Sequence, residues 1–295
     1  MKIGAVFPHQ EIGNDPVVIR DWAQAAEELG YSHLLVYDHV LSASHEDRQP
    51  ALWGPYTEHD PFHEPMVLFG YFAACTRRVE LVTGVLILPQ RQTALVAKQT
   101  AEIDLLSGGR LRLGIGTGWN YVEYDGLGED FGSRGPRQEE QVDLLRQLWD
   151  SALVDFEGDF HRVERAGLNP LPGRQIPIWF GGFAPVAFRR AARLGDGFIY
   201  GSGNENNLAA HEMMLAELAK VGRSADDFGF EALMNFQSGP AHWRTEAEGW
   251  LAAGADYISM RAQRLRGQGQ GLDSPQAHID ALRTYWQAVG DLASD

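Results

Sequence analysis

The sequence predicts an α/β protein of the TIM (β/α)8 barrel class, formed by a single domain over residues 1–295. Helical patterns alternate with short apolar strands eight times, the order that gives a parallel sheet. A helix ending in glycine and followed within a few residues by an apolar strand recurs at Gly30, Gly195 and Gly254. The length of 295 residues suits such a barrel, which typically needs ~250 residues plus insertions.

The first β/α unit shows the pattern. Residues 2–7 form an apolar strand, and Asp15 and Pro16 are typical of the N-cap and first turn of a helix. Apolar residues then recur at helical spacing over 16–29, and 33–37 is rich in Leu and Val. We therefore expect strand, helix and strand in this order.

The other units follow the same logic. An open doubly wound sheet is the alternative, but residues 7–10 lack the G-x-G-x-x-G turn of dinucleotide-binding sheets. The predicted strands lie near 2–7, 33–37, 79–84, 110–116, 176–180, 197–200, 228–235 and 255–260, and the predicted helices near 16–29, 65–77, 93–106, 137–150, 185–194, 206–220, 243–253 and 274–289.

Three connections are long. Residues 38–64 and 117–136 follow strands, so they lie on the side where TIM barrels place their active sites. Residues 151–175 precede the fifth strand and contain a predicted hairpin that turns at Gly158. Long loops in a compact domain are commonly functional, so the first two are candidate walls of a site.

Composition restricts the class of partner. The net charge of −15 argues against nucleic acid and acidic membranes as partners. The N-terminus lacks a secretory apolar segment and no run approaches membrane-spanning length, so we expect a cytoplasmic protein. His59, Asp60, His63 and Glu64 lie close together in one loop, but they match no zinc motif, and we expect no metal.

The strand ends indicate the chemistry. They are rich in glycine and aromatic residues and poor in paired carboxylates, which suits a flat cofactor against the backbone. His39 is the candidate for proton transfer, and Asp38 precedes it on the opposite face of an extended chain. Gly84 interrupts an apolar strand, as at a simple bulge or at a close approach to the backbone. Gly181 and Gly182 open a helix and favour a phosphate.

These residues resemble the bacterial luciferase-like flavin- and F420-dependent oxidoreductases over nearly the whole chain. The matching features are Asp38-His39, the run from Thr83 to Val85, residues 106–119 (LSGGRLRLGIGTGW), and Gly181-Gly182 followed by residues 191–197 (AARLGDG). The Ser-Gly-Gly-Arg block and the Gly-Trp pair look most like the F420-dependent branch.

The resemblance implies a metal-free barrel, often a homodimer, that acts on a small molecule. It implies a non-proline cis bond at Gly84–Val85 behind the cofactor ring, with His39 facing the reacting carbon. The family's sugar-phosphate dehydrogenase has a catalytic glutamate where this chain has Trp119, so we assign Trp119 to a substrate wall, with His9 beside it. The expected cofactor-binding residues are Phe7, Thr83, Gly84, Val85, Gly116, Gly118, Gly181, Gly182, Phe183, Tyr200 and Gly201.

Three functions remain open from the sequence. The first is hydride transfer between coenzyme F420 and a small organic substrate, with Arg91 and Arg261 as candidate groups for the acidic cofactor tail. The second is an FMN-dependent monooxygenase that uses molecular oxygen. The third is a barrel that binds a flavin without catalysis. Both cofactors carry a tricyclic ring and a phosphate, so the sequence separates them poorly.

Overall fold

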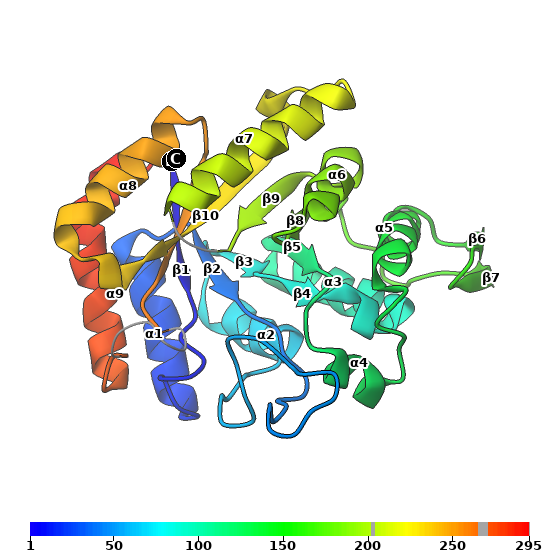
Figure 1. Cartoon of the computed structure of the whole chain (residues 1–295), viewed down its shortest axis with the longest axis horizontal. Helices are drawn as coiled ribbons and strands as arrows, with labels where there is room; N and C mark the ends of the chain where they lie inside the picture. Colours follow the sequence, from blue (N-terminus) through cyan, green and yellow to red (C-terminus); the bar gives the residue numbers. More distant parts are fainter. Residues whose placement is uncertain (202–203, 265–270, 295) are drawn as a thin grey trace.

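A computed structural model describes residues 1–201, 204–264 and 271–294. Eight parallel strands form a closed barrel surrounded by helices (Figure 1). The barrel closes where β1 pairs with β11 and β3 pairs with β5. The strands of the barrel are β1 (Lys2–Val6), β2 (His33–Val36), β3 (Glu80–Thr83), β5 (Leu111–Gly116), β8 (Ile178–Gly181), β9 (Gly197–Tyr200), β10 (Gly229–Asn235) and β11 (Tyr257–Arg261).

The helices cover the outside of the barrel and confirm the predicted alternation. Between them and the strands lies a continuous apolar layer, to which the helices contribute their buried faces. The α-helices are α1 (Pro16–Leu29), α2 (Pro65–Cys75), α3 (Thr93–Ser107), α4 (Tyr121–Leu127), α5 (Arg134–Asp150), α6 (Pro185–Leu194), α7 (Asn204–Lys220), α8 (Pro240–Ala252) and α9 (Pro275–Val289). The 3-10 helices are η1 (Leu88–Gln90), η2 (Ala225–Asp227), η3 (Phe236–Ser238) and η4 (Gly290–Leu292).

Helix α4 was not among the predicted elements. It interrupts the long connection after β5, where the sequence suggested only loop. The side chain of Asn120 caps it by accepting a hydrogen bond from the backbone N–H of Val122 at 3.1 Å. This short helix matters for function because it carries Glu123, described below.

The stretch after β3 has the predicted interruption. The peptide bond between Gly84 and Val85 is cis, which confirms the prediction for this bond. The chain then resumes as a short strand, β4 (Leu86–Ile87), which pairs with β5. The Oγ1 of Thr83 donates to the carbonyl of Gly114 at 2.7 Å, which ties the end of β3 to β5.

The insertion before β8 is the predicted hairpin. Strands β6 (Val154–Glu157) and β7 (Arg162–Ala166) are antiparallel and lie at the margin of the molecule (Figure 1). Glu140 on α5 holds the turn, because its carboxylate accepts from the backbone N–H of Asp159 at 2.7 Å and contacts Nδ1 of His161 at 2.7 Å. The hairpin is therefore attached to the outer helices and lies away from the β9 to β11 side.

The barrel interior is layered. Near the amino ends of the strands, Arg112 donates to Glu231 at 2.6 Å and to Glu80 at 2.9 Å. Above this charged layer lies an apolar cluster. Its buried members are Val6, Leu35, Tyr37, Val82, Trp179, Ile199 and Leu233, with Tyr56, Phe62, Val85 and Tyr257 packed against them. The bore is thus filled, and the carboxyl ends of the strands form the mouth, as is usual for this fold.

Candidate active site

Glycines at the ends of β5 and β8 leave space for Val85 at the base of the mouth. We call Gly116, Gly181 and Val85 the glycine floor. A Cβ at Gly116 would lie 2.5 Å from Cγ2 of Val85, and one at Gly181 would lie 2.8 Å from its Cγ1. Real Cβ atoms do not approach other carbons so closely. The valine that follows the cis bond can therefore occupy this place only because both neighbouring strands end in glycine.

A second group of glycines lies around the start of α6. Gly182 has φ +152°, which favours glycine, and a Cβ there would lie 2.9 Å from that of Ala187. The ring of Phe183 covers Gly201 so closely that a Cβ at Gly201 would lie 2.7 Å from it. Ala184 is the N-cap of α6 and gives it no side-chain cap. Pro185 carries no backbone N–H and that of Ala187 bonds the carbonyl of Ala184 at 2.8 Å, so the N–H of Val186 is left to face an anion.

His39 is paired with a carboxylate that sequence reasoning missed. Its Nδ1 lies 2.9 Å from Oε2 of Glu123, which is buried. The other oxygen of Glu123 accepts from the backbone N–H of Val40 at 2.7 Å and of Leu41 at 3.0 Å. Since a carboxylate is only an acceptor, Nδ1 of His39 carries the proton, and Nε2 is left as the second functional nitrogen.

The environment keeps Glu123 ionised. Burial raises its pKa, but the hydrogen bonds from His39, Leu41 and Val40 together outweigh burial, so its pKa lies below the ordinary value. The spacing of Asn120 and Glu123 resembles a capping box, a signal that could have revealed α4. It could not have revealed the contact with His39, because the two residues are 84 positions apart.

Asp38 has partners other than His39. Its Oδ1 accepts from Nη2 of Arg91 at 2.7 Å, and its Oδ2 accepts from the backbone N–H of Ile87 at 2.9 Å. Arg91 also binds Glu64 at 2.9 Å, so two carboxylates already engage this candidate group for the cofactor tail. Asp38 thereby fixes the chain that follows the cis bond.

Aromatic rings surround His39. The ring centroids of Phe62, Tyr56 and Trp119 lie 4.8, 5.3 and 5.7 Å from that of His39, all edge to face. Trp119 packs over Gly54, where a Cβ would lie 2.3 Å from the indole. The loop of residues 38–64 and the end of β5 therefore meet at His39, as the expected wall of the site requires.

His9 lies next to this group at the end of β1. Its Nδ1 accepts from the backbone N–H of His63 at 3.1 Å. Burial, and then the nearby His63 and His39, lower the pKa of His9 to about 3. His9 is therefore neutral at physiological pH. It can contribute polarity to the site but holds no charge there.

Four expected cofactor residues face away from the mouth or already contact other groups. Phe7 packs edge to face on Trp22 at 5.4 Å in the outer apolar layer. Tyr200 belongs to the same layer, and its hydroxyl lies 3.0 Å from Nδ1 of His211. The hydroxyl of Thr83 is taken by Gly114. Gly118 lies against Ile87, where a Cβ would come within 2.8 Å.

Within 1–201, 204–264 and 271–294, no three His, Cys, Asp or Glu side chains are grouped so as to hold a metal ion. In the same part of the chain, no helix is both long and apolar enough to cross a membrane.

Sequence similarity to known proteins identifies the family to which this chain belongs. A sequence model of the luciferase-like monooxygenases matches residues 1–295. The F420-dependent glucose-6-phosphate dehydrogenase of Nakamurella multipartita is 30% identical over 296 residues, which cover 92% of this chain and 83% of the relative. The chain therefore belongs to the luciferase-like monooxygenase family and is an oxidoreductase.

Solved structures show the same fold. A monooxygenase from Streptomyces bottropensis superposes with a TM-score of 0.78 at 18% identity, covering 99% of this chain and 100% of that one. An F420-dependent secondary alcohol dehydrogenase, in complex with an F420-acetone adduct, superposes with a TM-score of 0.76 at 17% identity over 99% of both chains. These similarities support the TIM barrel described above.

Proposed function

We propose that this enzyme transfers hydride between coenzyme F420 and a small organic substrate. The observation that carries the proposal is the glycine floor around Val85, placed beside the His39–Glu123 pair. Curated relatives of about 30% identity named as F420-dependent dehydrogenases support the choice of cofactor. An FMN-dependent monooxygenase is the competing function, since the matching family is described as luciferase-like monooxygenase.

The residues at the mouth fit a tricyclic ring with a phosphate. The absence of side chains at Gly116 and Gly181 leaves backbone and Val85 to support a flat ring. The first turn of α6, after Gly182 and Phe183, offers the backbone N–H of Val186 to a phosphate. When bound, the deazaflavin supplies the ring carbon that gives or accepts hydride.

The protein's own contribution is proton transfer and orientation. Glu123 fixes the Nδ1–H tautomer of His39, so Nε2 can take a proton from a substrate hydroxyl or return one to a carbonyl. Asp38 positions this region through Arg91 and Ile87. The rings of Phe62, Tyr56 and Trp119 exclude water around His39.

Cofactor titration tests the choice of F420. Purified protein is titrated with F420 and with FMN, and binding is followed by fluorescence and calorimetry. We expect F420 to bind and FMN to bind much more weakly, because the relatives that support this choice of cofactor are named as F420-dependent dehydrogenases. Tight FMN binding without detectable F420 binding would contradict the proposal and favour the monooxygenase.

The role of His39 is tested in the same system. His39→Ala should abolish turnover while cofactor affinity is retained, because the imidazole is assigned to the proton and the backbone to the ring. His242→Ala, which removes an exposed histidine on α8, is the matched control and should leave turnover unchanged. Unchanged turnover in His39→Ala would remove the proton role.

A further inference from the structure

A polar cavity of about 510 Å³ is lined in part by Tyr56, a neighbour of His39. This volume is in the range of ~300–1,000 Å³ that small-molecule sites usually occupy. Its lining comes from the loop of residues 38–64 and from the turns after β1 and β11. Tyr56 belongs to the lining, and its ring contacts that of His39 at 5.3 Å. The cavity and His39 thus share Tyr56 as a common neighbour.

The charged side chains in this lining are mostly acidic. Of those the structure describes, four are the carboxylates of Glu11, Glu46, Glu58 and Asp60, and one is the guanidinium of Arg264. We call this cavity with these five residues the acidic pocket. The carboxylate charge repels anions and attracts cations across the shared space.

Local contacts lower the pKa of Glu11 and hold the side chain of Asp60. Burial raises the pKa of Glu11, but His278 and the backbone amides of Arg264 and Leu272 together lower it further, so its pKa lies below the ordinary value. Asp60 accepts from the backbone N–H of Thr57 at 2.7 Å. Neither carboxylate is neutralised by Arg264, whose contact with Glu11 is made by the backbone N–H at 3.1 Å.

The lining also contains uncharged polar side chains with atoms that lack a hydrogen-bond partner among the described residues. Both amide atoms of Gln10 and the Nε2 of His45 are buried without a hydrogen-bond partner in the described part of the chain. Buried polar atoms usually have partners, so a polar molecule that reached these three atoms would satisfy them. Such a molecule would offer hydroxyl or amino groups.

We propose that the acidic pocket admits a neutral or cationic polar substrate and excludes phosphorylated ones. The inference rests on the proposed function, since it places the substrate of the hydride transfer in this pocket. It separates this enzyme from its relatives named as glucose-6-phosphate dehydrogenases, whose substrate carries a phosphate dianion.

The charge of the pocket can be measured without cofactor or substrate. Ser44 lines the cavity, so Ser44→Cys in a Cys75→Ser background places one thiol there. Its rates of reaction with cationic aminoethyl and anionic sulfonatoethyl methanethiosulfonate are each divided by the rate for a small neutral thiol. We expect the cationic reagent to be favoured more than tenfold. Equal rates, or a preference for the anionic reagent, would overturn the proposal.

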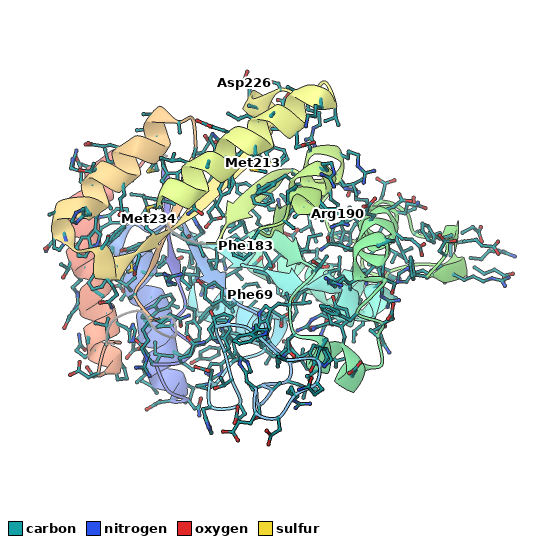
Figure 2. All side chains as sticks on the ribbon, in the orientation of Figure 1. Phe69, Phe183, Arg190, Met213, Asp226 and Met234 are labelled. Carbon is teal, nitrogen blue, oxygen red and sulfur yellow. The ribbon has the colours of Figure 1, made fainter. Side chains whose placement is uncertain are left out.

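Matched charge variants identify the source of the preference. Adding Glu46→Gln and Glu58→Gln, both exposed in the lining, should reduce the ratio at least threefold. Adding Asp226→Asn and Asp227→Asn instead removes the same charge at η2, on the opposite edge of the molecule (Figure 2), and should leave the ratio unchanged. A loss of the same size in both pairs would contradict a local effect.

Turnover then tests the substrate class. Glucose 6-phosphate, glucose and glucosamine share a scaffold and differ in charge. With F420 we expect kcat/KM for glucose 6-phosphate to be at least tenfold below that of the better of the other two. A preference for glucose 6-phosphate would overturn this inference while leaving F420 dependence intact. Failure to bind F420 would instead contradict the proposed function, and the thiol labelling would still decide the charge of the pocket.

Discussion

At the scale of single residues, the contacts of Glu123 define the state of His39. One oxygen of Glu123 accepts from Nδ1 of His39, and the other accepts from the amides of Val40 and Leu41. Three donors therefore converge on two acceptor oxygens. An uncharged amide in this place could not serve all three, since one of its two polar atoms would itself be a donor.

This arrangement makes Glu123→Gln informative. If its oxygen faces the two backbone amides, its NH2 faces His39 and forces the proton onto Nε2. We expect kcat to fall tenfold or more with cofactor affinity retained, together with a change of His39 tautomer in ¹⁵N NMR spectra. Glu129→Gln, which removes a carboxylate paired with Arg137, is the control and should show neither change. A normal kcat with the tautomer changed would show that the tautomer is not used.

His9 gives a prediction about pH and stability. Its pKa is lowered to about 3 by burial and by His63 and His39, whereas an unfolded histidine has a pKa of about 6.5. Between these values the unfolded chain binds the extra proton, so the free energy of unfolding falls as the pH falls from about 6.5 towards 3. We expect His9→Gln to flatten that slope, measured by urea denaturation across this range. An unchanged slope would contradict the assignment.

At the scale of elements, much of the fold could be predicted because local signals and tertiary packing agree. The helix from Pro16 to Leu29 has its expected cap at Asp15 and its left-handed glycine at Gly30. The strand-helix alternation then specifies a barrel without knowledge of any distant contact. Helix α4 escaped prediction because it has only seven residues, so its apolar periodicity is too short to detect.

The glycine floor is a property of three neighbouring elements. Gly116→Ala would place a methyl group 2.5 Å from Val85, a contact that only backbone or side-chain movement can relieve. We expect a loss of about 1–3 kcal/mol in the free energy of unfolding and weaker cofactor binding. Urea denaturation and F420 titration measure the two effects.

A glycine elsewhere supplies the control for this substitution. Gly70 lies inside α2, and a Cβ there would meet nothing within 4 Å. Gly70→Ala should stabilise the protein by about 0.5–1 kcal/mol, because alanine is the better helix former. If both alanine variants behaved alike, packing at the floor would not be the cause.

At the scale of the whole molecule, a charged layer joins distant strands inside the barrel. Glu231 on β10 binds Arg112 on β5 at 2.6 Å, and it also lies 2.8 Å from His33 on β2. Ser259 on β11 donates to Glu231 at 2.6 Å. Burial raises the pKa of Glu231, but Arg112 and His33 outweigh it, so its pKa lies well below the ordinary value.

Removing this charge should affect the entire fold. Glu231→Gln removes the fully buried carboxylate that pairs with Arg112 and leaves Glu80 as its remaining carboxylate partner. Breaking a buried pair costs about 3–5 kcal/mol. The contribution of Glu231 is fully present above the unfolded pKa of about 4.3 and declines as the pH falls from there through the depressed pKa of the folded state. We therefore expect the loss of stability to be largest at pH 7 and reduced, but still present, near pH 3, measured by denaturation. Glu164→Gln, in an exposed pair with Arg162, should have little effect at either pH.

The candidate site could be predicted only in part from the sequence. The strand ends identify which residues share the mouth, and so they gave His39, Trp119 and the glycines. The strand ends do not show which aromatic side chains point into the barrel. Phe7 and Tyr200 face the helices, because successive side chains along a strand point alternately into and out of the barrel. The partner of His39 depends on the tertiary position of α4, which no local pattern records.

The filled bore has a kinetic consequence. Because Arg112, Trp179 and their neighbours occupy the interior, a ligand can enter or leave only through the carboxyl ends of the strands. Two ligands that react at the mouth must therefore share one opening. The one that lies deeper has to arrive first and depart last, so steady-state kinetics should show ordered addition, with the substrate's product released before the cofactor.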